Sequence, residues 1–420
     1  MDFNFIKYFN TFTAATALVF LSGCFSGPPR QESRETSINI SASDVREQQA
    51  PKIFSANQRR LLQLAFDTAS AVPARPHIKT RCRLQERAAT VALELDQPQL
   101  AETYVTQIKD WRRGTGHAFI GLYYARNDES VKAREQLEIA EKIAYAIKDW
   151  HKERIKTHIA RAYILLGEAA KARELTSDIE ELEAARAQKT EARVSRENQF
   201  EEQVGEIEKL LDSERFDIKR QALIAACQLV DNFYDDSCKR QQLESIITSS
   251  WDDIPVFVRI DLILRMTESA LGNNDKARAT NLTQRAADAY NNATWKPRHG
   301  IPVQARIAAL TYRAGERSKA ESLAEEALMN YREKEKSIVN IYRADTLVPL
   351  AEAYATMGNS SQALKLFHQA LDAGFVNPNS RPRAEDLAMI CCSMVKRDIE
   401  PSPTLWEHLR ERRNQLGDPW

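Results

Sequence analysis

Two series of small residues recur at an interval of 43 residues in the last third of the chain: Gly272, Gly315 and Gly358, and Ala277, Ala320 and Ala363. A glycine readily takes the left-handed backbone conformation that ends a helix, and an alanine lets two helices approach closely. Because both series keep the same interval, they indicate a repeated helical unit. This repeat constrains the fold more than any other feature of the sequence.

The rest of the chain also has a helical pattern. From about Asn57 onward, apolar residues follow the helical period in segments of about 12–18 residues, and no stretch alternates with period two long enough to predict a strand. Only 13 of the 420 residues are glycine, against a usual share of about 7 %. The sequence therefore predicts an all-α protein.

The clearest repeat spans residues 347–371. Its first predicted helix has small and apolar residues at Leu347, Leu350, Ala351 and Tyr354. After Gly358, its second predicted helix has them at Ala363, Phe367, Ala370 and Leu371. An earlier copy keeps the order with Ile159, Ala160, Tyr163, Gly167 and Ala172. These spacings resemble the tetratricopeptide repeat family.

The resemblance covers roughly residues 80–375. It implies a TPR-like helical-repeat solenoid, in which antiparallel helix pairs stack into a right-handed superhelix and the first helices form a concave face for a partner segment. The sequence departs from the family in its period, which is about 43 residues instead of the usual ~34. Ala324 and Thr176 replace the aromatic residue of the clearest unit, and Arg265 and Glu268 stand where small and aromatic residues are expected.

A second motif lies near the amino terminus. An apolar run from Ala14 is followed by Leu21-Ser22-Gly23-Cys24, which resembles the lipobox of bacterial lipoproteins. The resemblance implies that residues 1–23 are a signal peptide and that Cys24 carries a lipid. Phe25-Ser26 lacks the aspartate that retains lipoproteins in an inner membrane, which favours the outer membrane, facing the periplasm. An ordinary signal peptide with a chance cysteine and a buried amino-terminal helix are the alternatives.

The segments after the signal peptide differ in composition. Residues 24–56 are polar and have few aromatic residues, so they predict a flexible tether. Helical repeats are expected over residues 57–195 and again over 196–400, with a boundary near residue 195. Val194, Phe200, Val204, Ile207 and Leu211 could form one long helix at this boundary.

Residues 401–420 predict a capping helix that begins at Ser402 or Thr404. Leu405, Trp406 and Leu409 are expected to pack inward, and Arg410, Arg412 and Arg413 to face water.

No catalytic, phosphate-binding or metal-binding motif is present, so neither catalysis nor a cofactor or metal is predicted. The chain has 59 basic and 59 acidic residues, and this neutral balance argues against a nucleic-acid partner. Adjacent Cys391 and Cys392 are expected to lie in a helix core instead of forming a disulfide. His151 and His158 are too far apart along one helix to share a metal.

The resemblance points to a groove as the binding site. The predicted first helices place six charged or polar residues on one face: Arg154, His158, Arg161, Arg306, Arg313 and Glu352. Such a partly basic groove could bind an acidic or carboxyl-terminated segment. The same residues could instead be solvated charges on amphipathic helices.

Three functions remain open. The first is a membrane-anchored scaffold that binds envelope proteins or peptide segments and has no catalysis of its own. The second is a glycan- or ligand-binding lipoprotein that uses aromatic residues such as Trp111, Trp251 and Trp295. The third is a cell-wall hydrolase with a helical superstructure.

Overall fold

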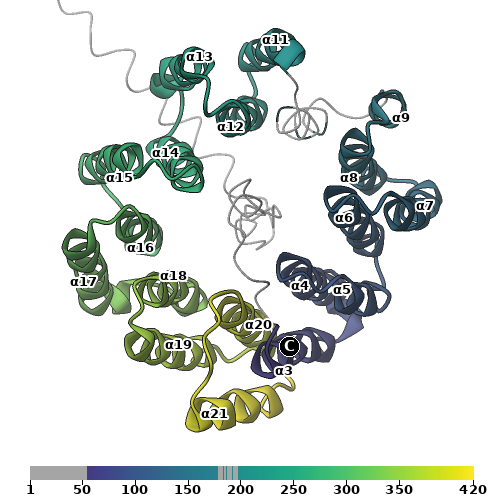
Figure 1. Cartoon of the computed structure of the whole chain (residues 1–420). Helices are drawn as coiled ribbons and strands as arrows, with labels where there is room; N and C mark the ends of the chain where they lie inside the picture. The colour runs from purple at the N-terminus through teal and green to yellow at the C-terminus, as the bar shows by residue number, and fades with distance from the viewer. Residues whose placement is uncertain (1–53, 178–182, 184–185, 187–191, 193–196) are drawn as a thin grey trace, which may run out of the picture. The chain divides into compact units, whose positions relative to one another are not determined.

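The computed structural model describes residues 54–177 and 197–420, together with Glu183, Arg186 and Ala192 (Figure 1). The expected signal peptide, Cys24 and the tether as far as residue 53 lie outside the described residues, as does the expected boundary near residue 195. Within the described ranges there are 18 α-helices, four short 3-10 helices and no strand. The expectation of an all-α protein is confirmed.

Most helices form pairs joined by short turns, and each pair has a first and a second member. The first helices are α4 (Ala74–Glu94), α6 (Arg112–Arg126), α8 (His151–Leu165), α12 (Phe216–Asn232), α14 (Val256–Gly272), α16 (Pro297–Arg313), α18 (Arg343–Thr356) and α20 (Ser380–Lys396). The second helices are α5 (Pro98–Val105), α7 (Ser130–Ala146), α9 (Ala169–Thr176), α13 (Ser237–Ser249), α15 (Lys276–Asn291), α17 (Arg317–Lys334) and α19 (Ser360–Phe375).

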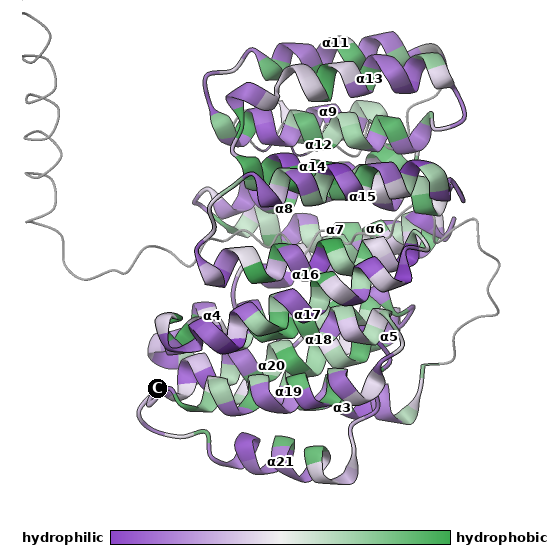
Figure 2. Cartoon of the chain, turned by 90° about the vertical axis from the view of Figure 1, so that its left-hand side faces the viewer, coloured by the Kyte–Doolittle hydropathy of each residue, from purple (hydrophilic) through white to green (hydrophobic). Residues whose placement is uncertain are grey.

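Three further helices are α3 (Ala56–Ala71), α11 (Phe200–Leu211) and α21 (Pro403–Asn414). The 3-10 helices are Glu197–Gln199, Trp251–Asp253, Glu335–Ser337 and Asn340–Tyr342. The hydropathy colouring of Figure 2 shows polar and apolar residues alternating around the helices, as expected for amphipathic helices with one buried side.

Seven of the first helices end in the same way. Each is followed by one residue with positive φ: Asp96, Asp128, Gly167, Asn274, Gly315, Gly358 and Asp398. The next N–H donates to the carbonyl oxygen five residues back, as Asn359 does to Tyr354 at 2.9 Å and Glu129 to Tyr124 at 2.9 Å. This is the hydrogen bond of the Schellman motif, which satisfies a carbonyl group that the helix end would leave free.

Six of the seven second helices, all except α13, share a small residue at the same place. Four residues after the Schellman donor stands a buried alanine: Ala101, Ala133, Ala172, Ala279, Ala320 and Ala363. These alanines are 0–3 % exposed. Because a larger side chain would push the helices of a pair apart, the alanines explain why each pair packs closely.

One copy of the repeat is two residues out of the register expected from the sequence. Gly272 is the last residue of α14, and the residue with positive φ is Asn274. The buried alanine is correspondingly Ala279, whereas Ala277 is exposed. The expected uniform period of 43 is therefore wrong for this copy, because asparagine can adopt the left-handed conformation that we assigned to glycine.

Neighbouring pairs are joined through their first helices and through contacts between a second helix and the next first helix. The helix α6 packs against both α4 and α8, and α16 packs against both α14 and α18. Apolar side chains fill the space between the helices, in one cluster that runs from Ala118 to Leu175 and another that runs from Ala192 to Ala314. The first helices of successive pairs therefore adjoin one another along each of these two stretches of the chain.

The helix α20 is the last of the first helices along the chain. It packs against α3, the earliest helix described, as extensively as the two members of the other pairs pack together (Figure 1). Gln58 of α3 donates from Nε2 to the carbonyl oxygen of Val395 at 3.1 Å, across 337 positions of sequence. Ser55 and Gln58 form a capping box that starts α3. A helix from one end of the described chain thus fills the place of a second helix at the other end.

The carboxyl-terminal helix α21 begins after the N-cap Ser402, whose hydroxyl accepts from the Leu405 N–H at 3.2 Å. Leu405, Trp406 and Leu409 are buried, as expected. The expectation that Arg412 and Arg413 only face water is wrong, because Arg412 pairs with Asp372 and Arg413 donates to the Asp67 carbonyl oxygen.

The stripe expected to form one long helix is helical from Phe200 to its expected last residue, Leu211, in α11, where Phe200, Val204 and Ile207 are buried. The 3-10 helix Glu197–Gln199 precedes α11, so the α-helix begins at Phe200. Val194 lies outside the described residues.

Candidate functional site

The six residues expected to line a groove all lie on first helices. Arg154, His158 and Arg161 lie on α8; Arg306 and Arg313 lie on α16; Glu352 lies on α18. Since α16 and α18 pack together, Arg306, Arg313 and Glu352 lie on adjacent helices. We refer to the exposed side of α14, α16, α18 and α20 as the first-helix face.

Charged residues of this face pair between neighbouring helices. Arg306 Nη1 of α16 lies 3.1 Å from Asp261 Oδ1 of α14, and Arg265 Nε lies 3.1 Å from the other oxygen of Asp261. Burial by itself raises the pKa of Asp261, but the two guanidinium groups outweigh it and lower that pKa below its usual range. Asp261 is therefore ionised at neutral pH and ties α14 to α16.

Glu352 joins the next two first helices. Its carboxylate accepts from the Ser393 hydroxyl at 2.6 Å and lies 3.5 Å from Arg397 Nη2. Ser393 belongs to α20 and Arg397 follows it directly. Glu352 thus links α18 to α20, whereas Arg313 of α16 is exposed.

The three residues of α8 have different surroundings. The Arg154 guanidinium lies over the Trp111 ring at 5.5 Å from its centroid, and the His158 ring meets Phe119 edge-on at 4.6 Å. Arg161 is 8 % exposed and donates from Nη1 to His158 Nδ1 at 3.2 Å. These contacts place the three residues within the packing of α8 against α6, and Arg161 offers little surface to a partner.

Sequence reasoning did not identify Glu86, which is partly buried between α4 and α6. Its carboxylate accepts from the Thr115 hydroxyl and lies 3.3 Å from Arg112 Nε. Burial raises the pKa of Glu86, and the Thr115 hydrogen bond and the charges of Arg112 and Arg154 oppose the shift only in part. No local motif marks this carboxylate, because its partners come from different helices.

An aromatic cluster lies where the chain enters α6 and α8, and the guanidinium of Arg112, the partner of Glu86, lies over its Trp111 ring at 4.5 Å from the centroid. The Trp150 and His151 rings are stacked with centroids 3.9 Å apart, and Trp111 lies 4.7 Å from His151. Trp150 is 54 % exposed. By contrast, Trp295 stacks on Tyr290 and donates to its carbonyl oxygen at 2.9 Å, and Trp251 packs against the core.

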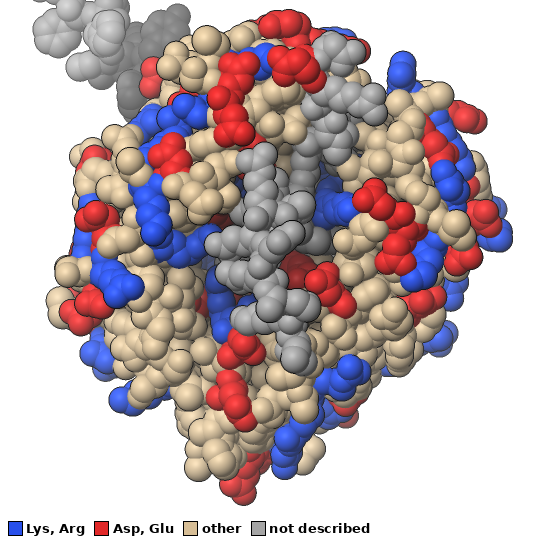
Figure 3. Space-filling model, in the orientation of Figure 1, with Lys and Arg blue, Asp and Glu red and all other residues tan. Residues whose placement is uncertain are grey.

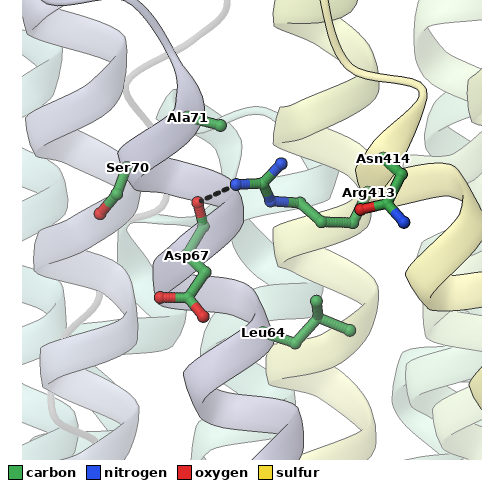
Figure 4. A pocket seen from close by; sticks show the side chains of 6 residues that line it. All are labelled: Leu64, Asp67, Ser70, Ala71, Arg413 and Asn414. Carbon is green, nitrogen blue, oxygen red and sulfur yellow. Dashed lines mark hydrogen bonds between the residues drawn. The ribbon is translucent and has the colours of Figure 1, made fainter.

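Leu64, Asp67, Ser70 and Ala71 of α3 form an open pocket with Arg413 and Asn414 of α21 (Figure 4). Its volume is about 380 Å³. Arg413 Nη2 donates to the Asp67 carbonyl oxygen at 3.3 Å across it. The wall is mostly polar and open to solvent, so the pocket lacks the enclosed apolar lining typical of a small-molecule site.

The surface visible in Figure 3 has basic and acidic side chains interspersed over its described part, without a region of one sign. Cys391 and Cys392 are buried and unbridged in α20. Over the described residues, no helix has both the length and the apolar character that crossing a membrane requires.

No protein-family model matches the sequence, and no curated protein matches it either. The described part of the structure therefore shows only the class of this protein: it is all-helical and built from successive helix pairs.

Proposed function

We propose that this chain is a membrane-anchored scaffold of the cell envelope, held by a lipid on Cys24 and built as a tetratricopeptide-like right-handed superhelix. Its role is to bind an envelope protein or peptide segment, without catalysis of its own. The outer membrane, facing the periplasm, is the proposed location. The observation that carries this proposal is the side-by-side packing of α14, α16 and α18, which gives a continuous first-helix face.

The chemistry of this face suits a polar partner segment. Exposed Arg313 lies two turns along α16 from Arg306, which pairs with Asp261, and Glu352 lies on the adjacent helix α18, so these helices offer cations and carboxylates at fixed positions. Charges held in this way give orientation and specificity to a bound segment more than affinity. An extended segment with acidic residues that alternate with polar ones would complement this pattern.

Site-directed photo-crosslinking in intact cells tests the proposal. A photoreactive amino acid in place of Arg313 on α16 is compared with the same amino acid in place of Arg332, an exposed arginine on the second helix α17. We expect one envelope protein to be captured from position 313 only. Equal capture from both positions, or none from either, would contradict binding at the first-helix face.

The membrane anchor has its own test. Metabolic labelling with an alkyne fatty acid is expected to mark the parent chain and not Cys24→Ala, and the unmarked variant is expected in the soluble fraction. If Cys24→Ala is labelled and sediments with membranes like the parent, the anchor is not on Cys24.

One observation favours a second candidate function, the binding of a glycan. Trp150 presents its ring at the surface beside His151 and Trp111, and such rings stack on sugar faces. Co-sedimentation with insoluble peptidoglycan tests this function. Trp150→Ala should abolish co-sedimentation if the cluster binds glycan, whereas Tyr145→Ala, which removes a 72 % exposed ring from α7, should not.

A further inference from the structure

Two histidines and an aspartate meet where α21 docks on α19. His368 and Asp372 are one turn apart on α19, and His408 comes from α21. His408 Nδ1 lies 3.1 Å from His368 Nε2, His368 Nδ1 lies 3.2 Å from Asp372 Oδ2, and His408 Nε2 lies 3.3 Å from Asp372 Oδ1. Among the described residues, this group alone brings three potential metal ligands of these types together.

These separations suit a metal ion. In a tetrahedral zinc site with bonds of about 2.0–2.1 Å, neighbouring ligand atoms are about 3.3 Å apart. One ligand atom from each of the three residues lies within 4.8 Å of the other two, so small side-chain rotations would bring them around one ion. Two imidazoles and a carboxylate are a donor set typical of Zn²⁺ and of related divalent transition metals.

The cluster is open enough for an ion to enter. The side chains of His368 and Asp372 are 45 % and 47 % exposed, and that of His408 is 15 % exposed. The ligands lie on helices whose packing is fixed by buried Leu405 and Leu409 of α21. The site is therefore accessible on one side and held by rigid elements on the other.

The guanidinium of Arg412 supplies a positive charge at the position where a metal ion would contact this cluster. Its Nε donates to His408 Nε2 at 2.9 Å, and its Nη2 lies 3.0 Å from Asp372 Oδ1. Because His408 Nε2 accepts this bond, it has a lone pair, and the proton of a neutral ring is on Nδ1, facing His368 Nε2. Arg412 thus holds two of the atoms that a metal would need.

Few other contacts hold the arginine. Its side chain is 26 % exposed, and its remaining contacts are the Gln415 side chain and the ring of Phe375, the last residue of α19. A dication at the same place would repel the guanidinium and release it into water. Metal and Arg412 therefore compete for the same ligand atoms.

We propose that His368, Asp372 and His408 form a binding site for Zn²⁺ or a related divalent transition metal, which displaces Arg412 and fastens α21 to α19. Three protein ligands leave the fourth position to water, as in open zinc sites. This site is independent of the proposed scaffold function, because none of its residues lies on the first-helix face.

Titration of the full, chelator-treated chain with ZnCl₂ in a calorimeter tests the proposal. We expect one site per chain, and tetrahedral absorption bands when Co²⁺ replaces Zn²⁺. His368→Ala and His408→Ala should each weaken binding by more than about ten-fold. His299→Ala, which removes a histidine from α16, should leave the affinity unchanged.

The variant Arg412→Gln tests whether these residues form a metal site or are only a chance cluster of surface side chains. Removing the competing cation should tighten Zn²⁺ binding several-fold, and Zn²⁺ should raise the melting temperature of the parent but not of His408→Ala. The His368→Ala variant keeps the more buried His408 and controls for a folding defect. Absence of 1:1 binding by the parent, binding that survives His408→Ala, or binding by Arg412→Gln alone would each overturn the proposal.

Discussion

The α18/α19 pair and the α20/α3 pair are built on similar first helices, yet they obtain their second helices differently. Both α18 and α20 end with a residue of positive φ, Gly358 and Asp398, and with the Schellman hydrogen bond. After Gly358 the second helix begins at Ser360. After Asp398 no helix begins until Pro403, and α3 packs on α20 instead.

Proline explains the difference. Pro401 fixes its own φ and disfavours the helical conformation for Glu400, so a second helix cannot start where it does after Gly358. The next helix, α21, starts later and docks elsewhere. The apolar side of α20 is then covered by α3, whose Leu61 and Leu62 are 0–1 % exposed.

The comparison shows that the place of a second helix is defined by the apolar surface of the first. Any amphipathic helix with a matching stripe can fill this place, whatever its position in the sequence. Terminal units of open helical-repeat proteins need polar caps, because one side has no neighbour. In this chain α3, the earliest helix described, covers α20.

Matched leucine truncations in the two pairs should have the largest effect on the free energy of unfolding. Leu62 of α3 and Leu371 of α19 are both 0 % exposed, so Leu62→Ala and Leu371→Ala should each cost about 2–5 kcal/mol of unfolding free energy. Urea unfolding measures both. A much smaller cost for Leu62→Ala would show that α3 is only loosely docked, and the two pairs would no longer be equivalent.

Alanine enlargements should have a smaller effect and test the register of the repeat. Ala279→Leu, like Ala363→Leu, should overpack a close helix crossing and cost about 1–3 kcal/mol. Ala277→Leu should be nearly neutral, because Ala277 is exposed. Thermal unfolding of the three variants decides between the two registers, since the register expected from the sequence predicts the opposite order for Ala277 and Ala279.

The helix ends that share this geometry can be tested by two substitutions that are expected to change the stability in different directions. Gly358→Ala should cost about 1 kcal/mol, because φ at this position is +77°. Asp128→Gly, at φ +58°, should be neutral or stabilising by less than about 1 kcal/mol. If both substitutions shift the unfolding midpoint in the same direction, the ends of α18 and α6 are not equivalent.

Removal of ion pairs between first helices should have the smallest effect on the free energy of unfolding. Lys396–Glu94 joins α20 to α4 and Arg306–Asp261 joins α16 to α14, both at 3.1 Å and with the cation 43 % exposed. Lys396→Gln and Arg306→Gln should each cost at most about 1 kcal/mol, and less in high salt. A distinctly larger, salt-independent loss for Lys396→Gln would show that the helices at the two ends depend on electrostatics.

The sequence alone was sufficient for the helical class and for several repeat positions. Ala172, Ala320 and Ala363 occupy the buried place expected of them, because a close helix crossing tolerates only a small side chain. The error at Gly272 and Ala277 has a local cause. Aspartate and asparagine can replace glycine at the left-handed position, so the glycine positions mark only some of these helix ends.

The candidate sites depended on tertiary structure. The six groove residues were correctly expected on helices, but their partners, such as Asp261 for Arg306, come from neighbouring helices and follow no spacing rule. His368 and Asp372 are four residues apart, a helical spacing that could have been noticed. Nothing in the sequence indicates that His408 joins them.

Local sequence determined how each helix begins, ends and accepts its neighbour, because these features depend on backbone sterics and on side-chain size over a few residues. Only the tertiary structure decided that α3 pairs with α20. That pairing joins residues far apart in sequence, such as Gln58 and Val395 at a separation of 337 positions, so no local stretch of the sequence encodes it.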